Sequence, residues 1–351
     1  MKPDRKGTIN NGQHKRGLVH VTDRNGHRAA YQDLFASILR LQPEVGLLRR
    51  SRVLRILFSR RVLFATISVE YHAYFAIAIA RALIGKPTCG LFLGAQNIAP
   101  QRKSFKSRIG AVLIKVAKRM QKVTMLTICP YSLRPSSSNS TDGWIYDPQL
   151  WDIVDEPKEK AVAPPAEAVR LRGRGKPVII FAGKGSKDKG FSELVEFAKT
   201  HSQHLSIIIA GKIDDDCKAA AGDLREMGMY VDDRYVPEKT LRAYYELADF
   251  SWCVYREKYD RPSGVFGRSL QFGVIPIVRT SSFLEKFSAE FNLPVILSRT
   301  EDTHRSELLT RLQAEIDKSS VSSGELVDRL RLMKEASMLK IRAGLMLPAA
   351  S

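Results

Sequence analysis

Cysteine is scarce in this 351-residue sequence, and its placement argues against two kinds of protein. None of the four cysteines belongs to a C-x-x-C pair or stands near a cluster of histidines: Cys89, Cys129, Cys217 and Cys253. This spacing argues against a zinc site and against a disulfide framework. It is typical of a chain kept in a reducing cytosol, so we expect a cytoplasmic protein.

A long uncharged apolar run is also missing. The most apolar stretch, 62–85, contains Glu70, His72 and Arg81, which are expensive to place inside a bilayer. The polar, basic stretch 1–16 lacks the apolar segment of a secretory signal. These absences predict a protein without a membrane-spanning helix, either soluble or lying on the inner face of a membrane.

Acidic residues are outnumbered, since 37 Asp and Glu stand against 56 Lys and Arg, for a formal net charge of +19. A charge of this size attracts nucleic acid, anionic membrane surfaces or phosphorylated ligands. The basic runs show no regular interleaving with aromatic residues, and no signature of a nucleic-acid-binding fold occurs. We therefore do not expect nucleic acid as a partner.

The order of the apolar segments predicts two α/β domains. Short apolar runs alternate with helical patterns in both halves, which is typical of doubly wound parallel sheets. We expect an N-terminal domain over 1–155, a linker over 156–176 that is rich in Pro, Ala and charged residues, and a C-terminal domain over 177–345. Strands are expected in the N-terminal half at 18–22 and 124–128, with further apolar runs at 53–58, 62–69 and 88–93, and in the C-terminal half at 177–182, 205–210, 229–231, 250–255, 275–278 and 294–297.

A glycine-rich loop with three lysines follows the first strand of the C-terminal half. Its sequence is AGKGSKDKG, and a helix is expected to begin near Phe191. A helix N-terminus offers unpaired N–H groups and the positive end of a dipole, and Lys184 and Lys189 could neutralise a diphosphate there. The spacing is not that of a P-loop. A tight turn with solvated lysines explains the pattern equally well, so both interpretations stay open.

A second loop precedes another helix start, in the sequence REKYDRPSGVFGRSLQFGVIPIV. The glycines at Gly264 and Gly267 would let a ligand approach the backbone closely. Asp260 stands just before them and could accept hydrogen bonds from sugar hydroxyls. A plain turn or helix-capping role for Asp260 carries similar weight.

These segments, in their order, resemble the C-terminal donor domain of glycosyltransferase family 4 and its GT-B relatives. The resemblance covers about 177–297 and continues through IIIAGK, YVPEKTLRAYYELADFSWC and the entry to the strand at 275–278. It implies the GT-B fold, in which two Rossmann-like domains face each other across a cleft. It also implies residues that hold the donor diphosphate, which we place at Lys184, Lys189, Ser263, Gly264 and Val265.

One pair of positions departs from the family. The family has two glutamates spaced by seven residues, of which the first contacts the donor sugar and the second the ribose; the matching positions here are Asp260 and Arg268. Asp260 can still accept a hydroxyl hydrogen bond, whereas Arg268 has only donors. Arg268 is therefore expected to meet a phosphate or to pair with a carboxylate.

In the N-terminal half, the resemblance implies acceptor binding. Its first βα loop contains Gly26 and His27, which we name as acceptor-loop candidates, although a turn glycine beside a surface histidine fits as well. Glu70 and His72 follow an apolar run, where ligands of open α/β sheets bind, and either could serve as a general base. A retaining enzyme of this fold needs no such base, because the departing diphosphate can take the proton.

Two basic stretches of the N-terminal half suit an anionic membrane surface. Over 102–122, apolar residues fall on one helical face and lysines and arginines border the other; 49–61 repeats this chemistry over a shorter span. An ordinary helix with a basic solvent face is the alternative.

The sequence as a whole predicts a glycosyltransferase. It would move a sugar from a nucleotide-sugar to a saccharide or lipid-linked acceptor, in cell-surface polysaccharide synthesis. We expect no metal and no cofactor, because the acidic run 214–216 begins a helix and forms no metal motif. The alternatives are a nucleotide-sugar epimerase or hydrolase of the same fold, and a non-catalytic basic adaptor on a degenerate scaffold.

Overall fold

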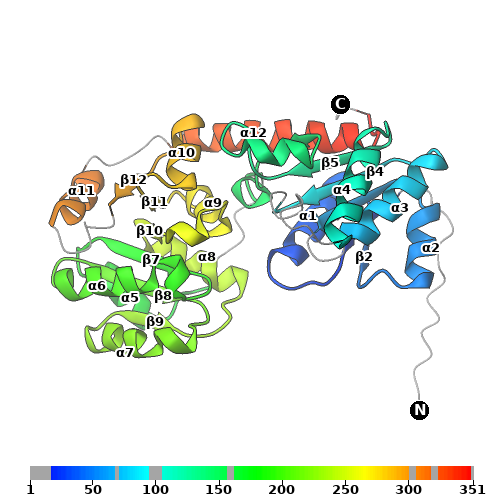
Figure 1. Cartoon of the computed structure of the whole chain (residues 1–351). Coiled ribbons are helices and arrows are strands. Elements are labelled where there is room, and N and C mark those ends of the chain that lie inside the picture. The colour runs from blue at the N-terminus through cyan, green and yellow to red at the C-terminus, as the bar shows by residue number, and fades with distance from the viewer. Residues whose placement is uncertain are drawn as a thin grey trace, which may run out of the picture. The chain divides into compact units, whose positions relative to one another are not determined.

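The chain divides into two compact units (Figure 1). The structure is a computed structural model and describes residues 17–67, 71–94, 105–155, 162–299, 306–317 and 323–348. One unit comprises residues 1–146 and 335–351, and the other comprises residues 147–334. Each is an α/β unit built on one parallel sheet.

The first unit contains a six-stranded parallel sheet in the order β2-β1-β3-β4-β5-β6. Its central strands are almost wholly buried and apolar, as expected of a parallel sheet covered on both faces. The strands span Leu18–Val21 (β1), Gln42–Val45 (β2), Val62–Ile67 (β3), Thr88–Phe92 (β4), Val123–Thr127 (β5) and Gly143–Trp144 (β6).

Helices cover this sheet in two groups. Helices α2 (Arg50–Phe58), α3 (Tyr71–Leu83) and α4 (Phe105–Lys118) share one apolar core with β3, β4 and β5. Helix α1 (His27–Leu39) follows β1 and leads back to the edge strand β2, so the right-handed crossover rule places it on the opposite face. A short 3₁₀ helix, η3 (Pro135–Asn139), precedes β6.

The apolar run at 53–58 is helical rather than extended. It lies in α2, where Ile56 is buried while Leu54 and Phe58 are exposed, which is a helical and not an alternating pattern. The edge strand β2 was not predicted. Its sequence QPEV contains Pro43, which a strand tolerates at the edge of a sheet.

The second unit contains a six-stranded parallel sheet in the order β12-β11-β10-β7-β8-β9. Every strand expected for this half from the sequence is present, with small shifts of its ends. The strands span Val178–Ala182 (β7), Ser206–Ala210 (β8), Tyr230–Asp232 (β9), Phe250–Cys253 (β10), Ile275–Arg279 (β11) and Ile296–Ser298 (β12).

Two apolar cores fill the faces of the second sheet. One joins α6 (Phe191–His201), α7 (Lys218–Glu226) and α11 (Ser306–Asp317); the other joins α5 (Ala166–Arg172) and α8 (Glu238–Leu247). The remaining helices are α9 (Gly264–Gln271), α10 (Phe283–Glu290) and α12 (Ser323–Gly344), with 3₁₀ turns η4 (Pro148–Leu150), η5 (Lys187–Lys189), η6 (Asp215–Cys217) and η7 (Glu257–Tyr259).

The division of the chain differs from the predicted one at three places. Residues 147–155 belong to the second unit, and part of the expected linker is helix α5, whose Ala168 and Leu171 are buried in a core. Residues 335–351 belong to the first unit, where Ser337 accepts a hydrogen bond from the Tyr146 amide at 3.1 Å and Lys340 donates to the Trp144 carbonyl at 2.7 Å. Such contacts join residues far apart in sequence, so composition could not reveal them.

Across the ranges that the structure describes, no helix is both long enough and apolar enough to cross a bilayer.

Candidate functional site

The carboxyl ends of β7 and β10 meet at one edge of the second sheet. These strands are hydrogen-bonded neighbours, and β10 pairs in turn with β11. The loop after β7 contains the predicted lysines, and the loop after β10 leads to the start of α9. Ligands of open α/β sheets bind at such edges, so this is the candidate site.

Lys189 and the start of α9 converge on a single glycine. Gly183, the residue after β7, has φ +84°, and a Cβ added there would lie 3.3 Å from Lys189 Nζ and 3.7 Å from Val265 Cγ2. A side chain at this position would therefore occupy the space between the ammonium group and the helix. This is a cradle suited to an anion, with a cation on one side and the N-terminus of an eight-residue helix on the other.

The start of α9 is held by two hydroxyl groups. Ser263 is the N-cap, and its Oγ accepts a hydrogen bond from the Phe266 amide at 3.5 Å. The Tyr255 hydroxyl lies 2.8 Å from Ser263 Oγ, so the cap is fixed to the end of β10. Burial raises the pKa of Tyr255 well above its ordinary value, so this phenol stays neutral and brings no negative charge to the cradle.

The turn that carries Lys189 is fixed to the same strand. Gly190 has φ +72°, and an added Cβ would overlap the carbonyl oxygen of Val254. Trp252 Nε1 donates to the Gly190 carbonyl at 2.9 Å, and the Arg256 amide donates to the Asp188 carbonyl at 3.0 Å. The two loops are therefore held together before any ligand arrives.

Lys184 lies differently from Lys189. Its ammonium group is 2.9 Å from Asp214 Oδ1, and the hydrogen bond to and negative charge of that carboxylate raise the pKa of Lys184. Lys187 pairs with Asp216 at 3.3 Å in the same way. The acidic run 214–216 thus neutralises lysines of the neighbouring loop, and Lys189 is the lysine of this loop that lies beside α9.

Asp260 lies at the same sheet edge, where it caps a helix. Its Oδ1 accepts a hydrogen bond from the Phe283 amide at 2.7 Å and lies 3.6 Å from Arg279 Nη2. The side chain is partly exposed. Asp260 therefore caps a helix and also presents a partly exposed carboxylate at the edge of the candidate site.

Arg268 is enclosed in the protein, and the structure pairs it with a carboxylate. Nη1 and Nη2 donate to the two oxygens of Asp152, the second at 2.8 Å, and Nε lies 3.0 Å from Glu238 Oε1. Burial alone would lower the pKa of Arg268, but the charge of and hydrogen bonds to Asp152 outweigh it and raise the pKa. A direct contact with donor ribose does not fit this arrangement, because the guanidinium group is already used and buried.

Sequence reasoning missed the segment that covers α9. Gln149 lies directly against Gly264, where an added Cβ would overlap its side-chain amide, and its carbonyl accepts from Gln271 Nε2 at 2.8 Å. Gly267 is needed for the same reason, since its added Cβ would lie 2.5 Å from the Gln149 carbonyl oxygen. The two small residues in the helix were the available signal.

The candidates of the N-terminal half lie at the carboxyl edge of the first sheet. Gly26 is the N-cap of α1 with φ +57°, and the His27 ring lies 5.2 Å from that of Tyr31. His72 is in the first turn of α3, after β3, with its ring 3.9 Å from that of Tyr71. Because β1 and β3 are neighbours, these residues share an edge. Glu70 lies outside the described residues.

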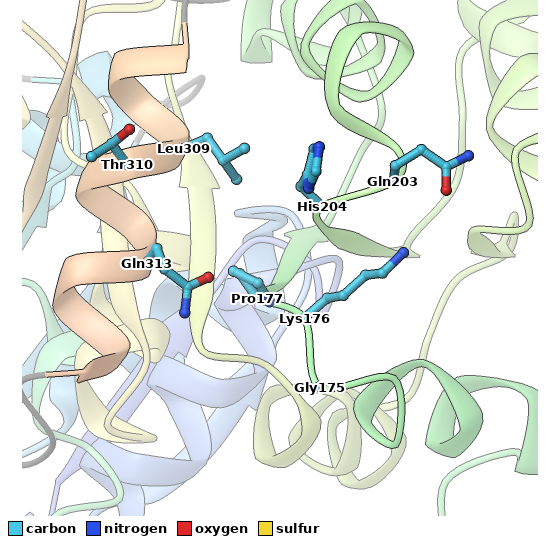
Figure 2. Close-up of a pocket in the computed structure, with 8 residues that line it drawn as sticks. All are labelled: Gly175, Lys176, Pro177, Gln203, His204, Leu309, Thr310 and Gln313. Atoms are coloured by element: carbon cyan, nitrogen blue, oxygen red, sulfur yellow. The ribbon is translucent and has the colours of Figure 1, made fainter.

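A cavity of about 440 Å³ lies away from these loops (Figure 2). Pro177 and His204, which precede β7 and β8, place it at the amino end of the second sheet. Lys176 and Gln203 lie on the same side of the opening, and Leu309, Thr310 and Gln313 of α11 lie on the other. This cavity does not include any residue of the candidate site. In the part of the chain that the structure describes, no group of three or more His, Cys, Asp or Glu side chains is placed to hold a metal ion.

Solved structures with the same architecture bind nucleotide-sugars. No model of a protein family and no curated protein sequence matches this chain. HepE (Alr3699) of Anabaena, solved with UDP and glucose, is 10% identical with a TM-score of 0.56, covering 95% of this chain and 98% of its own. The same protein with UDP-glucose gives 10% identity and a TM-score of 0.55, covering 94% and 97%.

A trehalose-6-phosphate structure from E. coli, bound with UDP-2-fluoro glucose, is 9% identical with a TM-score of 0.50, covering 83% of this chain and 74% of its own. These likenesses, together with the two parallel sheets, show that the chain has the GT-B fold expected from its sequence.

Proposed function

We propose that this protein is a glycosyltransferase that uses a nucleotide-sugar donor. The observation that carries the proposal is the convergence of Lys189 and the start of α9 on Gly183, a position whose φ of +84° disfavours a side chain. A donor diphosphate has the charge and size for this cradle. The similar structures of Anabaena and E. coli were solved with UDP, UDP-glucose or a UDP-glucose analogue, which supports the same ligand class here.

In this proposal, the protein stabilises the leaving diphosphate without a metal. Negative charge grows on the diphosphate as the bond to the sugar breaks, and Lys189 together with the N–H groups of Gly264 and Val265 would stabilise it. Hydrogen bonds between the loop that contains Gly190 and the loop after β10 hold Lys189 and the start of α9 in place, so little reorganisation is needed during the reaction.

We further propose a retaining reaction in which the departing diphosphate accepts the proton of the acceptor hydroxyl. His72 and Glu70 then position the acceptor; in an inverting enzyme one of them would instead be the base. Gly26 and His27 lie at the same sheet edge as His72 and are proposed to contact the acceptor.

The proposed acceptor is a saccharide, free or linked to a lipid carrier, used in building a cell-surface polysaccharide. The protein would then work in the cytoplasm on the inner face of the membrane, which it reaches through the basic stretches 49–61 and 102–122. An epimerase or hydrolase of the same fold would use the same cradle but no acceptor, and an adaptor would not need the cradle.

Donor binding tests the proposal directly. A thermal-shift screen with UDP, GDP and their glucose conjugates should raise the melting temperature of the wild type with at least one ligand. Lys189→Ala should weaken the binding of that ligand about tenfold or more, because a hydrogen bond between charged groups contributes about 1.5–3 kcal/mol. Lys212→Ala is the matched control, since Lys212 is an exposed lysine that pairs with Asp233 at 3.6 Å outside the cradle.

The outcomes separate the three functions. Transfer of labelled sugar to an added saccharide supports a transferase, whereas free sugar or an epimer without acceptor identifies the second function. If no nucleotide or nucleotide-sugar shifts the wild type, donor binding is refuted and the adaptor remains.

A further inference from the structure

The positive charge of the chain resides in one unit. Residues 1–146 and 335–351 contain 27 Lys and Arg against 7 Asp and Glu, while residues 147–334 contain 29 against 30. The second unit, which holds the candidate donor cradle, is therefore almost neutral. The excess charge needs an explanation other than the binding of a nucleotide diphosphate.

Within the first unit the charge concentrates on three consecutive helices. Residues 45–141 contain 17 Lys and Arg and a single acidic residue, Glu70. Helices α2, α3 and α4 contain no Asp or Glu at all, and they lie side by side on one face of the sheet (Figure 1). A solvent-exposed helical layer ordinarily mixes both signs of charge, so this layer is specialised.

Large apolar side chains project from the same layer. Phe58 at the end of α2 is 67% exposed and Leu83 at the end of α3 is 74% exposed. Leu54, Ile84 and Val112 are each more than half exposed. Isolated exposed apolar residues are common, but a group of them on an acid-free surface indicates an interaction site.

Cations stand directly beside these apolar tips. Lys86 Nζ lies 5.3 Å from the centroid of the Phe58 ring and donates to the Phe58 carbonyl at 2.5 Å. Lys122 Nζ donates to the Gly85 carbonyl at 2.9 Å, so it lies at the turn that carries Leu83 and Ile84. Apolar groups next to ammonium groups match the layers of a bilayer interface, where acyl chains lie just beneath anionic headgroups.

A buried arginine fixes the ends of α2 and α3 to each other. Arg81 is fully buried, and it donates to the carbonyls of Leu57 and Ser59 at 3.0 Å each and to Thr88 Oγ1 at 2.8 Å. Burial lowers the pKa of Arg81 to about 10, so the side chain keeps its charge at neutral pH. Phe58 and Leu83 are thus held on one preformed surface.

We propose that the outer face of α2, α3 and α4, with the turn after α3, docks on an anionic lipid bilayer. We call it the basic helical face; its apolar members are Leu54, Phe58, Leu83, Ile84 and Val112. The inference rests on the membrane location in the proposed function and extends it, since α3 joins the two basic stretches into one surface. Four of these five side chains are aliphatic and give nucleic-acid bases little to stack on, which favours lipid over RNA or DNA.

Sedimentation with vesicles tests the docking. The wild-type protein should sediment with vesicles of phosphatidylcholine and phosphatidylglycerol and stay in solution with phosphatidylcholine alone. Lys115→Ala with Arg119→Ala should weaken binding about 30-fold, because each cation near an anionic surface contributes about 1 kcal/mol. Arg170→Ala with Arg225→Ala is the matched control in the second unit, where both side chains are exposed, and should bind as the wild type does.

The apolar contribution is tested separately. Phe58→Ser with Leu83→Ser should weaken vesicle binding more than tenfold, since inserting such side chains contributes about 1.5–3 kcal/mol each when complete. These residues are exposed, so the melting temperature should stay near that of the wild type. Leu332→Ser, at an exposed leucine of α12 in the second unit, is the control and should leave binding unchanged.

Several results would overturn the inference. Equal binding to neutral and anionic vesicles would do so, as would unchanged binding by both double variants. A dimer in solution that Phe58→Ser dissociates, or binding of RNA without binding of vesicles, would also overturn it. Transfer of sugar to a soluble acceptor without vesicles is measured in parallel. Unchanged transfer with lost vesicle binding separates a docking defect from a failure of the proposed function.

Discussion

Removing the partner of Arg268 should destabilise the second unit strongly. Both side chains of the Arg268–Asp152 ion pair are almost fully buried, and Gln271 Nε2 adds a hydrogen bond to Asp152 at 2.8 Å. Among the residues that the structure describes, Asp152→Ala leaves the buried guanidinium with Glu238 as its carboxylate neighbour, and Glu238 is mostly exposed. Breaking a buried pair in this way costs about 3–5 kcal/mol, and the remaining contact with Glu238 favours the lower end.

The assay is urea unfolding followed by tryptophan fluorescence and circular dichroism. Asp155→Ala is the matched control, because Asp155 is a half-exposed carboxylate three residues away that pairs with Lys334 at 2.7 Å and Arg331 at 3.3 Å. Loss of an exposed pair should cost about 1 kcal/mol or less. Limited proteolysis should also cut Asp152→Ala faster within 147–155, since that segment loses its ion pair with Arg268 of α9.

A second substitution distinguishes the cost of an unpaired buried guanidinium from the cost of losing the other contacts of the Asp152 side chain. Adding Arg268→Met to Asp152→Ala removes the buried charge and should recover a large part of the lost stability. If Asp152→Ala costs less than about 1 kcal/mol, or if Arg268→Met gives no recovery, the buried-pair reasoning is refuted. If Asp152→Ala is as stable as the wild type but binds UDP more weakly, the result would indicate that Arg268 takes part in donor binding.

Two further outcomes follow from single residues. Burial lowers the pKa of His20, whose Nε2 lies 2.9 Å from the Gly46 carbonyl oxygen, so the unfolded chain takes up the proton first as the pH falls. The stabilisation from His20 should be full above about pH 6.5 and should decrease as the pH drops below that value. Urea midpoints measured between about pH 8 and pH 5 should depend less on pH in His20→Gln than in the wild type. A pH-independent difference would contradict this. Gly190→Ala should cost about 2–4 kcal/mol of stability, because of the φ of +72° and the clash of the added Cβ with Val254. Gly222→Ala, which adds a Cβ in open space within α7, should stabilise the protein by up to about 1 kcal/mol. Equal melting temperatures of the two variants would show that Gly190 is not required at its position.

The sequence predicted what is encoded locally. The strands of the second sheet are short, apolar and bounded by turn residues, and the loop at 183–190 shows its glycines and lysines in one run. The helix start marked by Gly264 and Gly267 is likewise a local signal. These features are set by neighbours in the chain, so pattern alone located them.

Long-range partners could not be predicted in the same way. Asp152 and Gln149 meet α9 from more than 100 residues away, and nothing near them in sequence announces a contact with Arg268 or Gly264. The pairing of Lys184 with Asp214 likewise depends on which loops the sheet order brings together. The family resemblance points to both lysines of this loop, and only the packing distinguishes Lys189, beside α9, from Lys184, which pairs with Asp214.

The absence of Asp and Glu from α2, α3 and α4 has a consequence for regulation. Carboxylates titrate near pH 4, and lysine and arginine titrate near pH 10 or above. A surface without carboxylates therefore keeps the charge of its lysines and arginines across the cellular pH range. Ionic strength acts instead, because the Debye length is about 8 Å at physiological salt and shortens as salt rises. Adsorption of this protein should therefore respond to salt and to the anionic lipid content of its membrane, and hardly to acidity.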